Sequence, residues 1–314
     1  MHRKRLCAVI LAIAVLLCGC GGAAPEQPKL EMRRAAPVTS PALTSVPKGT
    51  VSILESGFHS GEARGANGVL LDLSAVQDGY VAVSAVSEKR LKFQVKIGEE
   101  TYTYNLAGDG TPSVFPLSCG DGEYRFRVME NVTDSKYAEL YSDSCAVTLR
   151  DEFQPFLRPS DYVPYDAESL CVARAAELAA AAGSEAELIG AIYGYICKNV
   201  RYDREKAAAV TAGYLPDPDA TMQSGLGICF DYASLAAAML RSQGIPTRVI
   251  FGYVSPNDVY HAWNMFYSAE QGWVTVSFEI RENDWTRMDA TFAANGADDS
   301  FIGDGGNYSD VYCY

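Results

Sequence analysis

Residues 225–246 read GLGICFDYASLAAAMLRSQGIP and place Cys229 between a glycine-rich turn and an apolar run that Gly244 and Pro246 end. We predict a helix that begins at or just before Cys229, because apolar residues recur at helical spacing, at Ala233, Leu235, Ala236, Met239 and Leu240. Unpaired N–H groups and the positive end of the helix dipole at such a start favour a thiolate over a thiol. Position alone does not separate a nucleophile from a core cysteine, since free cysteines are often buried.

Residues 1–19 have the proportions of a signal peptide: the basic segment MHRKR precedes an apolar run that is too short to span a membrane comfortably. The following motif, LLCGC at residues 16–20, resembles the lipobox of bacterial lipoproteins. This resemblance implies lipidation of Cys20 and an extracytoplasmic protein anchored to the bacterial cell membrane. An ordinary cleaved secretion signal and an uncleaved anchor are the alternatives.

Residues 20–49 are dense in proline, alanine, serine and threonine, which predicts a disordered tether. The formal net charge is -13, and removal of residues 1–19, which contain Arg3, Lys4 and Arg5 but no acidic residue, makes it -16. Such a surface repels nucleic acid and anionic lipid, so we expect no nucleic-acid partner and membrane attachment through the lipid alone. Nothing in the sequence indicates an oligomeric state.

Six cysteines follow the tether: Cys119, Cys145, Cys171, Cys197, Cys229 and Cys313. An even number in an exported chain leaves disulfides open, and a disulfide at Cys229 would exclude it as a nucleophile. The spacings are wide and lack a CxxC pair, so we expect these thiols to serve mostly in packing. With three histidines in the chain a zinc site of the finger type is not expected. The acidic loops are too irregular to identify as calcium sites, although loops of this sort could bind one ion weakly. We therefore predict no metal and no cofactor.

The chain divides into two predicted domains of an α+β protein. Residues 50–150 alternate apolar and polar side chains between turns, which predicts a small antiparallel β-sandwich. Residues 151–314 predict helices followed by an antiparallel sheet. We expect a helix over 167–182, a second helix capped by Ser184 and Glu187, and a long loop over residues 201–225. The strands are expected after the Cys229 helix, at 247–254, 260–268, 272–280 and 285–292.

A cysteine nucleophile needs a base, and the base needs a third group to orient it. His59 lies in a glycine and serine turn of the first domain, whereas His261 opens a predicted strand after the cysteine helix. We therefore favour His261 as the base, although a strand histidine can also be held by backbone bonds alone. For the third group, Asp289 within an apolar strand is favoured over Asp284 in a polar turn, because an acid among apolar residues needs a polar partner.

Three blocks in this order resemble the transglutaminase-like superfamily of papain-type thiol enzymes, across most of residues 190–314. They are GICFDYASLAAAMLRSQGIPTRVIFGYV, YHAWNMF and MDATF, and the upstream segments YGYICKNVRYD and GYLPD resemble a bacterial branch. The resemblance implies a papain/transglutaminase-like core with Cys229 as nucleophile, His261 as base and Asp289 as its orienting group. It also implies that Trp263 walls the site. The papain motif C-G-S-C-W is absent, so the resemblance concerns fold and triad.

The implied chemistry is acyl transfer on protein or peptide amides, and the choice between hydrolysis and transamidation stays open. We expect the backbone N–H of Cys229 to stabilise the oxyanion, with Gln223 or Tyr202 as candidates for a second donor. Asp231 is expected to stabilise the first helical turn through the helix dipole. The alternative function is that of an inert surface-binding or adhesion lipoprotein.

Overall fold

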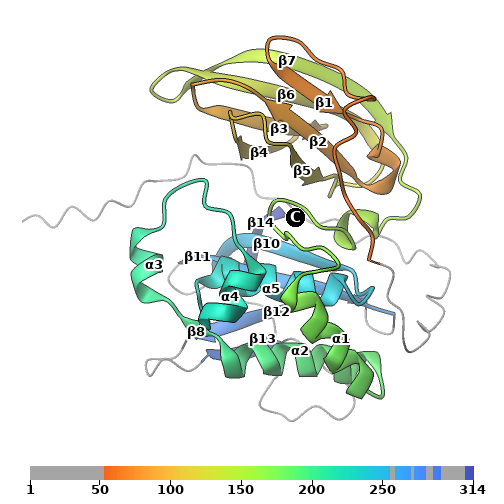
Figure 1. The fold of residues 1–314 in the computed structure, drawn as a ribbon, viewed down its shortest axis with the longest axis vertical. Coiled ribbons are helices and arrows are strands. Elements are labelled where there is room, and N and C mark those ends of the chain that lie inside the picture. Colours follow the sequence, from red (N-terminus) through yellow and green to blue (C-terminus); the bar gives the residue numbers. More distant parts are fainter. Residues whose placement is uncertain (1–52, 255–258, 270–271, 281–285, 291–307) are drawn as a thin grey trace, which may run out of the picture. The chain divides into compact units, whose positions relative to one another are not determined.

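The computed structural model describes residues 53–254, 259–269, 272–280, 286–290 and 308–314. The predicted signal peptide, the tether and the lipidation site at Cys20 therefore lie outside the described residues. Within these ranges, no helix combines the length and the apolar character needed to cross a membrane. Antiparallel sheets come first along the chain, helices follow, and another antiparallel sheet comes last, as the α+β prediction requires (Figure 1).

Two antiparallel sheets form the N-terminal part. The first has the order β1-β2-β5, with β1 at Val69–Asp72, β2 at Tyr80–Ala85 and β5 at Ser113–Pro116. The second has the order β4-β3-β6-β7, with β3 at Leu91–Ile97, β4 at Glu100–Leu106, β6 at Gly122–Thr133 and β7 at Lys136–Val147. One short 3-10 helix, Val76–Asp78, connects β1 to β2, and another, Gln154–Phe156, follows β7.

Side-chain alternation brings these two sheets together. Leu91, Phe93 and Val95 of β3 are buried, whereas the residues between them are more exposed. The ring of Phe93 stacks on that of Phe115 from β5, with 5.0 Å between the ring centroids. Since β3 and β5 belong to different sheets, this contact joins their inner faces. The predicted antiparallel sandwich is confirmed.

Five helices follow: α1 at Leu170–Ala181, α2 at Glu185–Asn199, α3 at Arg204–Ala209, α4 at Pro218–Ser224 and α5 at Cys229–Arg241. The predicted cap of α2 is confirmed, because the Ser184 side chain accepts a hydrogen bond from the Glu187 backbone N–H. The Glu187 carboxylate bonds the backbone N–H of Gly183, one residue earlier than the capping box places it.

The prediction of a loop over residues 201–225 is wrong. This segment contains α3 and α4, and Asp203 and Asp217 cap them by accepting hydrogen bonds from Lys206 N and Ala220 N. The two helices have six and seven residues, too few to produce a recognisable apolar period. The segment begins with β8 at Arg201–Tyr202, which pairs in parallel with β9 at Leu226–Gly227.

The last sheet has the order β13-β12-β11-β10-β14, and every neighbouring pair is antiparallel. Its strands are β10 at Thr247–Val254, β11 at Val259–Ser268, β12 at Gly272–Ile280, β13 at Thr286–Ala290 and β14 at Tyr308–Cys313. Helix α5 is anchored to β11, because the buried Asn264 side chain donates a 3.0 Å hydrogen bond to the Ala233 carbonyl. This hydrogen bond therefore fixes the position of α5 on the face of the sheet.

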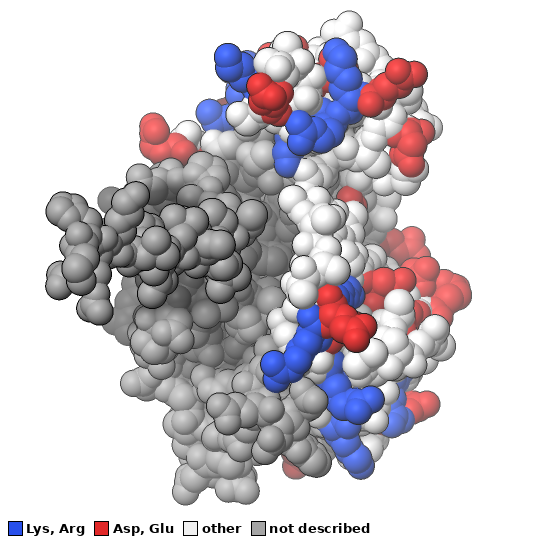
Figure 2. Space-filling model, turned by 90° about the vertical axis from the view of Figure 1, so that its left-hand side faces the viewer, with Lys and Arg blue, Asp and Glu red and all other residues white. Residues whose placement is uncertain are grey.

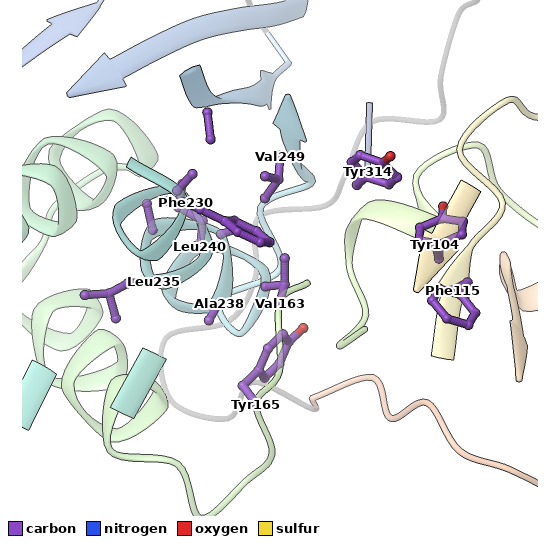
Figure 3. Close-up of a cluster of buried hydrophobic side chains, with 14 of the residues drawn as sticks. Tyr104, Phe115, Val163, Tyr165, Phe230, Leu235, Ala238, Leu240, Val249 and Tyr314 are labelled. Carbon is purple, nitrogen blue, oxygen red and sulfur yellow. The ribbon is translucent and has the colours of Figure 1, made fainter. Parts of the chain in front are cut away.

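The core centres on α5, which is buried from Phe230 to Arg241. Figure 3 shows Tyr314 between the side chains of α5 and Tyr104 of β4. The Tyr314 ring centroid lies 5.4 Å from that of Tyr104 and 5.6 Å from that of Phe251 in β10. Aromatic contacts thus continue the core of the last sheet into the N-terminal sheets.

Candidate active site

Cys229 is the first residue of α5, and Ile228 is its N-cap. The β8–β9 pair fixes the chain just before it: Arg201 N donates to the Gly225 carbonyl and Asp203 N to the Gly227 carbonyl, both at 2.9 Å. The predicted position of the cysteine at a helix start is confirmed. Its thiol is free and partly buried.

Two opposing effects act on the thiol of Cys229. Burial raises the pKa of Cys229 above its ordinary value of 9.0, although the backbone N–H groups of Ala262 and Phe230 act to lower it. The N–H groups at the helix start thus favour the thiolate as expected, but desolvation acts against them and has the larger effect. A thiol in this state needs a base to remove its proton.

The hydrogen bond from Ala262 places the sulfur of Cys229 against β11, one residue from His261. His261 pairs with Gly252 across β10 and β11, and its ring stacks at 21° to that of Trp263, with 6.5 Å between centroids. Trp263 is fully buried and packs with Ile250. The structure therefore brings the cysteine and the histidine strand together, and it buries the tryptophan beside the histidine.

Asp289 lies in β13, where its Cα partner is Ser277 of β12. Since β12 separates β13 from β11, the Asp289 backbone lies two strands from the histidine strand. Asp284, the alternative third group, lies outside the described residues.

The two candidates for a second oxyanion donor occupy different settings. Tyr202 lies in β8 and is partly buried. Burial raises the pKa of its phenol, and the nearby Cys229 raises it to a smaller extent. Gln223 lies in the last turn of α4, with an exposed side chain. His59 belongs elsewhere, because its Nδ1 lies 3.0 Å from Oδ2 of Asp72 in β1.

Sequence reasoning underrated Asp231, which is fully buried in the first turn of α5. One carboxylate oxygen accepts hydrogen bonds from Ile228 N at 2.8 Å and from Lys206 Nζ at 2.6 Å. The other accepts from the Tyr214 hydroxyl at 2.5 Å. The available signal was an acid directly before the apolar part of the helix, but its partners come from residues 201–225, which were expected to form a loop.

The remaining cysteines that carry free thiols fit a packing role. Cys171 is fully buried in α1, and burial raises the pKa of its thiol well above the ordinary range. Burial likewise raises the pKa of Cys119 and of Cys145. Among the described residues, no cluster of three or more histidine, cysteine or acidic side chains could hold a metal ion.

One cavity lies apart from the thiol. A polar cavity of about 530 Å³ opens beside the starts of α1 and α4, and its lining includes Asp166, Ser169 and Asp217 but not Cys229. Figure 2 shows lysines and arginines interspersed with acidic residues on the described part of one face. The start of α5, rather than the cavity, is therefore the candidate active site.

Residues 172–278 match the transglutaminase-like superfamily. A segment of 62 residues is 39% identical to a protein-glutamine gamma-glutamyltransferase of Pseudomonas aeruginosa, and the match covers 16% of this chain and 9% of the relative. The chain thus spans less than a tenth of the length of that relative.

Two solved structures are similar at low identity. A candidate cysteine protease from Cytophaga hutchinsonii is 18% identical, with a TM-score of 0.36 and coverage of 62% of this chain and 68% of that chain. Red sea bream transglutaminase is 14% identical, with a TM-score of 0.31 and coverage of 66% and 49%.

Proposed function

This chain contains a transglutaminase-like domain over residues 172–278, and on that premise we propose that it catalyses thiol-dependent acyl transfer with Cys229 as the nucleophile. One observation carries the proposal: the Cys229 thiol lies at the first residue of α5 and against the backbone of β11, one residue from the only histidine of this domain. A helix start and a neighbouring histidine are the two features that activate a cysteine.

His261 is the base in this proposal. The raised pKa of Cys229 means that the resting group is a thiol, so its proton must pass to a base as the sulfur attacks. The sulfur bonds to the carbonyl carbon of an amide, and the imidazolium returns the proton to the departing amine as the C–N bond breaks. Asp289 orients the imidazole and stabilises its charged form.

The thioester formed in this way has two fates. Water gives the acid, whereas a second amine gives a new amide, and in both cases the C–S bond breaks and the thiol returns. The backbone N–H of Cys229 stabilises the charge on the carbonyl oxygen, and Tyr202, whose phenol lies near the thiol, is favoured over the exposed Gln223 as the second donor. Loss of one such donor typically raises the barrier by about 3 to 4 kcal/mol.

The substrates are protein or peptide amides outside the cytoplasm, and the chain is held at the membrane by a lipid on Cys20. The LLCGC motif and the acidic balance of the remaining chain support this placement. Membrane fractionation of Cys20→Ala tests it: the variant should leave the membrane fraction, and its retention there would contradict lipid anchoring.

The function is tested by incubating the full chain with a glutamine-containing peptide library and a labelled amine. Labelled product indicates transamidation, ammonia without label indicates deamidation, and shortened peptides indicate hydrolysis of the backbone amide. Cys229→Ser should abolish each of these, whereas Cys145→Ser, a matched change at a partly buried cysteine of β7, should leave them intact. Absence of turnover in the unmodified chain would favour the inert surface-binding alternative.

A further inference from the structure

A buried negative charge lies two residues after the nucleophile. Asp231 has no exposed surface, and it holds the start of α5 by accepting the Ile228 N–H. A carboxylate this close opposes ionisation of a thiol, and it is among the groups that raise the pKa of Cys229. A neutral side chain such as asparagine could also accept the Ile228 N–H, so the cap alone does not require the charge.

The charge is matched by a cation from a different part of the chain. Lys206 lies in α3, and its Nζ lies 2.6 Å from Oδ2 of Asp231 and donates a second 2.6 Å hydrogen bond to the Tyr214 hydroxyl. The Nζ also lies 4.4 Å from the centre of the Tyr214 ring. The Lys206 side chain is 28% exposed, so the ammonium enters from the solvent side to reach a carboxylate that water does not reach.

We propose that Lys206 partly neutralises Asp231, so that this carboxylate can hold the start of α5 while opposing ionisation of the Cys229 thiol less than an unpaired charge would. Lys206 and Asp231 are therefore positioning residues, and Tyr214 fixes the geometry of their ion pair. This inference rests on the proposed function, because it assigns the ion pair a role toward the nucleophile of that reaction.

The other titratable groups around the thiol come from β8, α3 and β11. Tyr202 and Tyr260 are neutral near pH 7, because a phenol ionises only at much higher pH, and burial raises the pKa of Tyr202 further. Arg204 is a cation near Tyr202 and partly offsets that rise. His261, in β11, is the group that the proposed reaction titrates. These groups are unchanged in the variants below, so a shift in those variants reports on the ion pair.

The test measures the rate at which iodoacetamide alkylates Cys229 in the full chain, from pH 6 to 11, by mass spectrometry of the peptide that contains it. Lys206→Met should move the midpoint upward by about 0.5 to 1 pH unit and slow alkylation at pH 7.5 roughly 3- to 10-fold, because one pKa unit changes the thiolate fraction tenfold. Lys206→Arg should stay near the unmodified protein. Lys198→Met, at an exposed lysine in the last turn of α2, is the matched control and should cause no shift.

The decisive variant is the double change Lys206→Met with Asp231→Asn. It removes both charges while keeping an acceptor for Ile228 N, so the midpoint should return toward that of the unmodified protein. A double variant that is shifted as far as Lys206→Met, or a Lys206→Met midpoint that does not move, would overturn the inference. If Lys206→Met does not fold, Lys206→Gln tests the same loss of charge with a polar side chain.

Alkylation requires no turnover, so the two proposals fail separately. Midpoints that follow the prediction in a protein without acyl-transfer activity would overturn the proposed function and leave the electrostatic role standing. Normal turnover in Lys206→Met together with an unshifted midpoint would overturn the electrostatic role and leave the proposed function standing.

Discussion

The guanidinium of Arg241, in the last turn of α5, donates a 3.3 Å hydrogen bond to the backbone carbonyl of Tyr314 beyond β14. Its other nitrogens donate 2.8 Å hydrogen bonds to the carbonyls of Thr247 and Arg158. One buried cation thus joins the helix, β10, the segment before α1 and the end of the sheet. Burial lowers the pKa of Arg241 to about 10, which leaves it charged at neutral pH.

Replacing this cation should destabilise the fold. Arg241→Met removes the guanidinium donor from the carbonyls of Thr247, Arg158 and Tyr314, and Arg241→Lys cannot reproduce the planar fork. Each change should therefore lower the free energy of unfolding by about 2 to 4 kcal/mol. Urea denaturation measures the loss. Arg174→Met is the control, because Arg174 is paired on the surface with Glu177 and should change stability by less than about 0.5 kcal/mol. An Arg241→Lys variant as stable as the unmodified protein would contradict the role of the planar guanidinium.

A second prediction concerns Gly225, the residue that ends α4 in a left-handed conformation with φ of 63°. A Cβ there would lie 2.9 Å from the carbonyl oxygen of Asn199. Gly225→Ala should therefore cost about 1 to 2 kcal/mol of unfolding free energy, since both the left-handed backbone and the contact oppose a side chain. It should also lower turnover, because Gly225 accepts the Arg201 hydrogen bond that fixes the chain before Cys229.

The matched change is Gly190→Ala. Gly190 is exposed within α2, and a Cβ there meets no atom within 4 Å. Alanine should stabilise this helix by up to about 1 kcal/mol. Calorimetry and urea denaturation on both variants measure the difference in stability. Equal effects at the two glycines would contradict the claim that the backbone at Gly225 is held rigidly before Cys229.

The pH dependence of Cys229 gives a third prediction. Because its pKa lies above 9.0, alkylation in the unmodified protein should rise with pH and reach half its maximum above pH 9. The thiol should be largely protonated and slow to react at pH 7. Mass spectrometry of the alkylated peptide measures the profile. A midpoint near or below pH 8 would instead indicate a thiolate stabilised by a charged imidazole in the resting protein.

The fourth prediction concerns Asp72 of β1, which accepts hydrogen bonds from the backbone N–H groups of His59 and Ser74. Burial raises the pKa of Asp72, but hydrogen bonds from Ser74 and His59 outweigh it and bring the pKa below 3.8. A lowered pKa contributes stability above pH 3.8 and loses it as the pH falls through the folded value. Asp72→Asn should therefore cost about 1 to 3 kcal/mol at pH 7.

That deficit should shrink as the pH falls below about 4, because the aspartate of the unmodified protein becomes protonated and loses the same advantage. Urea denaturation at pH 7, 4 and 2.5 measures it. A deficit that stays constant over this range would show that Asp72 acts through its shape rather than its charge.

Periodicity and capping predicted the elements that depend on neighbouring residues. The helix that begins at Cys229, the cap at Ser184 and the alternation within the sandwich follow from side chains a few positions apart. The resemblance to known thiol enzymes added the order in which cysteine, histidine and aspartate occur. Local pattern and family likeness together predicted the α+β fold.

Features that depend on contacts distant in sequence were not predictable. Strand β14 pairs with β10, some 60 residues earlier, and its mixed polar and aromatic residues lack a clear pattern. The partners of Asp231 come from α3 and from Tyr214, and neither has a local signal for that role. The raised pKa of Cys229 also escaped prediction, because desolvation depends on how deeply the tertiary fold buries the sulfur.

The short parallel pair β8–β9 has a consequence for how this domain could diversify. By pairing Tyr202 with Gly227, it closes residues 203–225 into an excursion whose two ends leave and rejoin the domain side by side. Evolution could lengthen, shorten or exchange the tip of this excursion without displacing the cysteine, provided that the contacts of Lys206 and Tyr214 with Asp231 are kept. It is the natural place to graft a new recognition sequence onto an unchanged reaction centre.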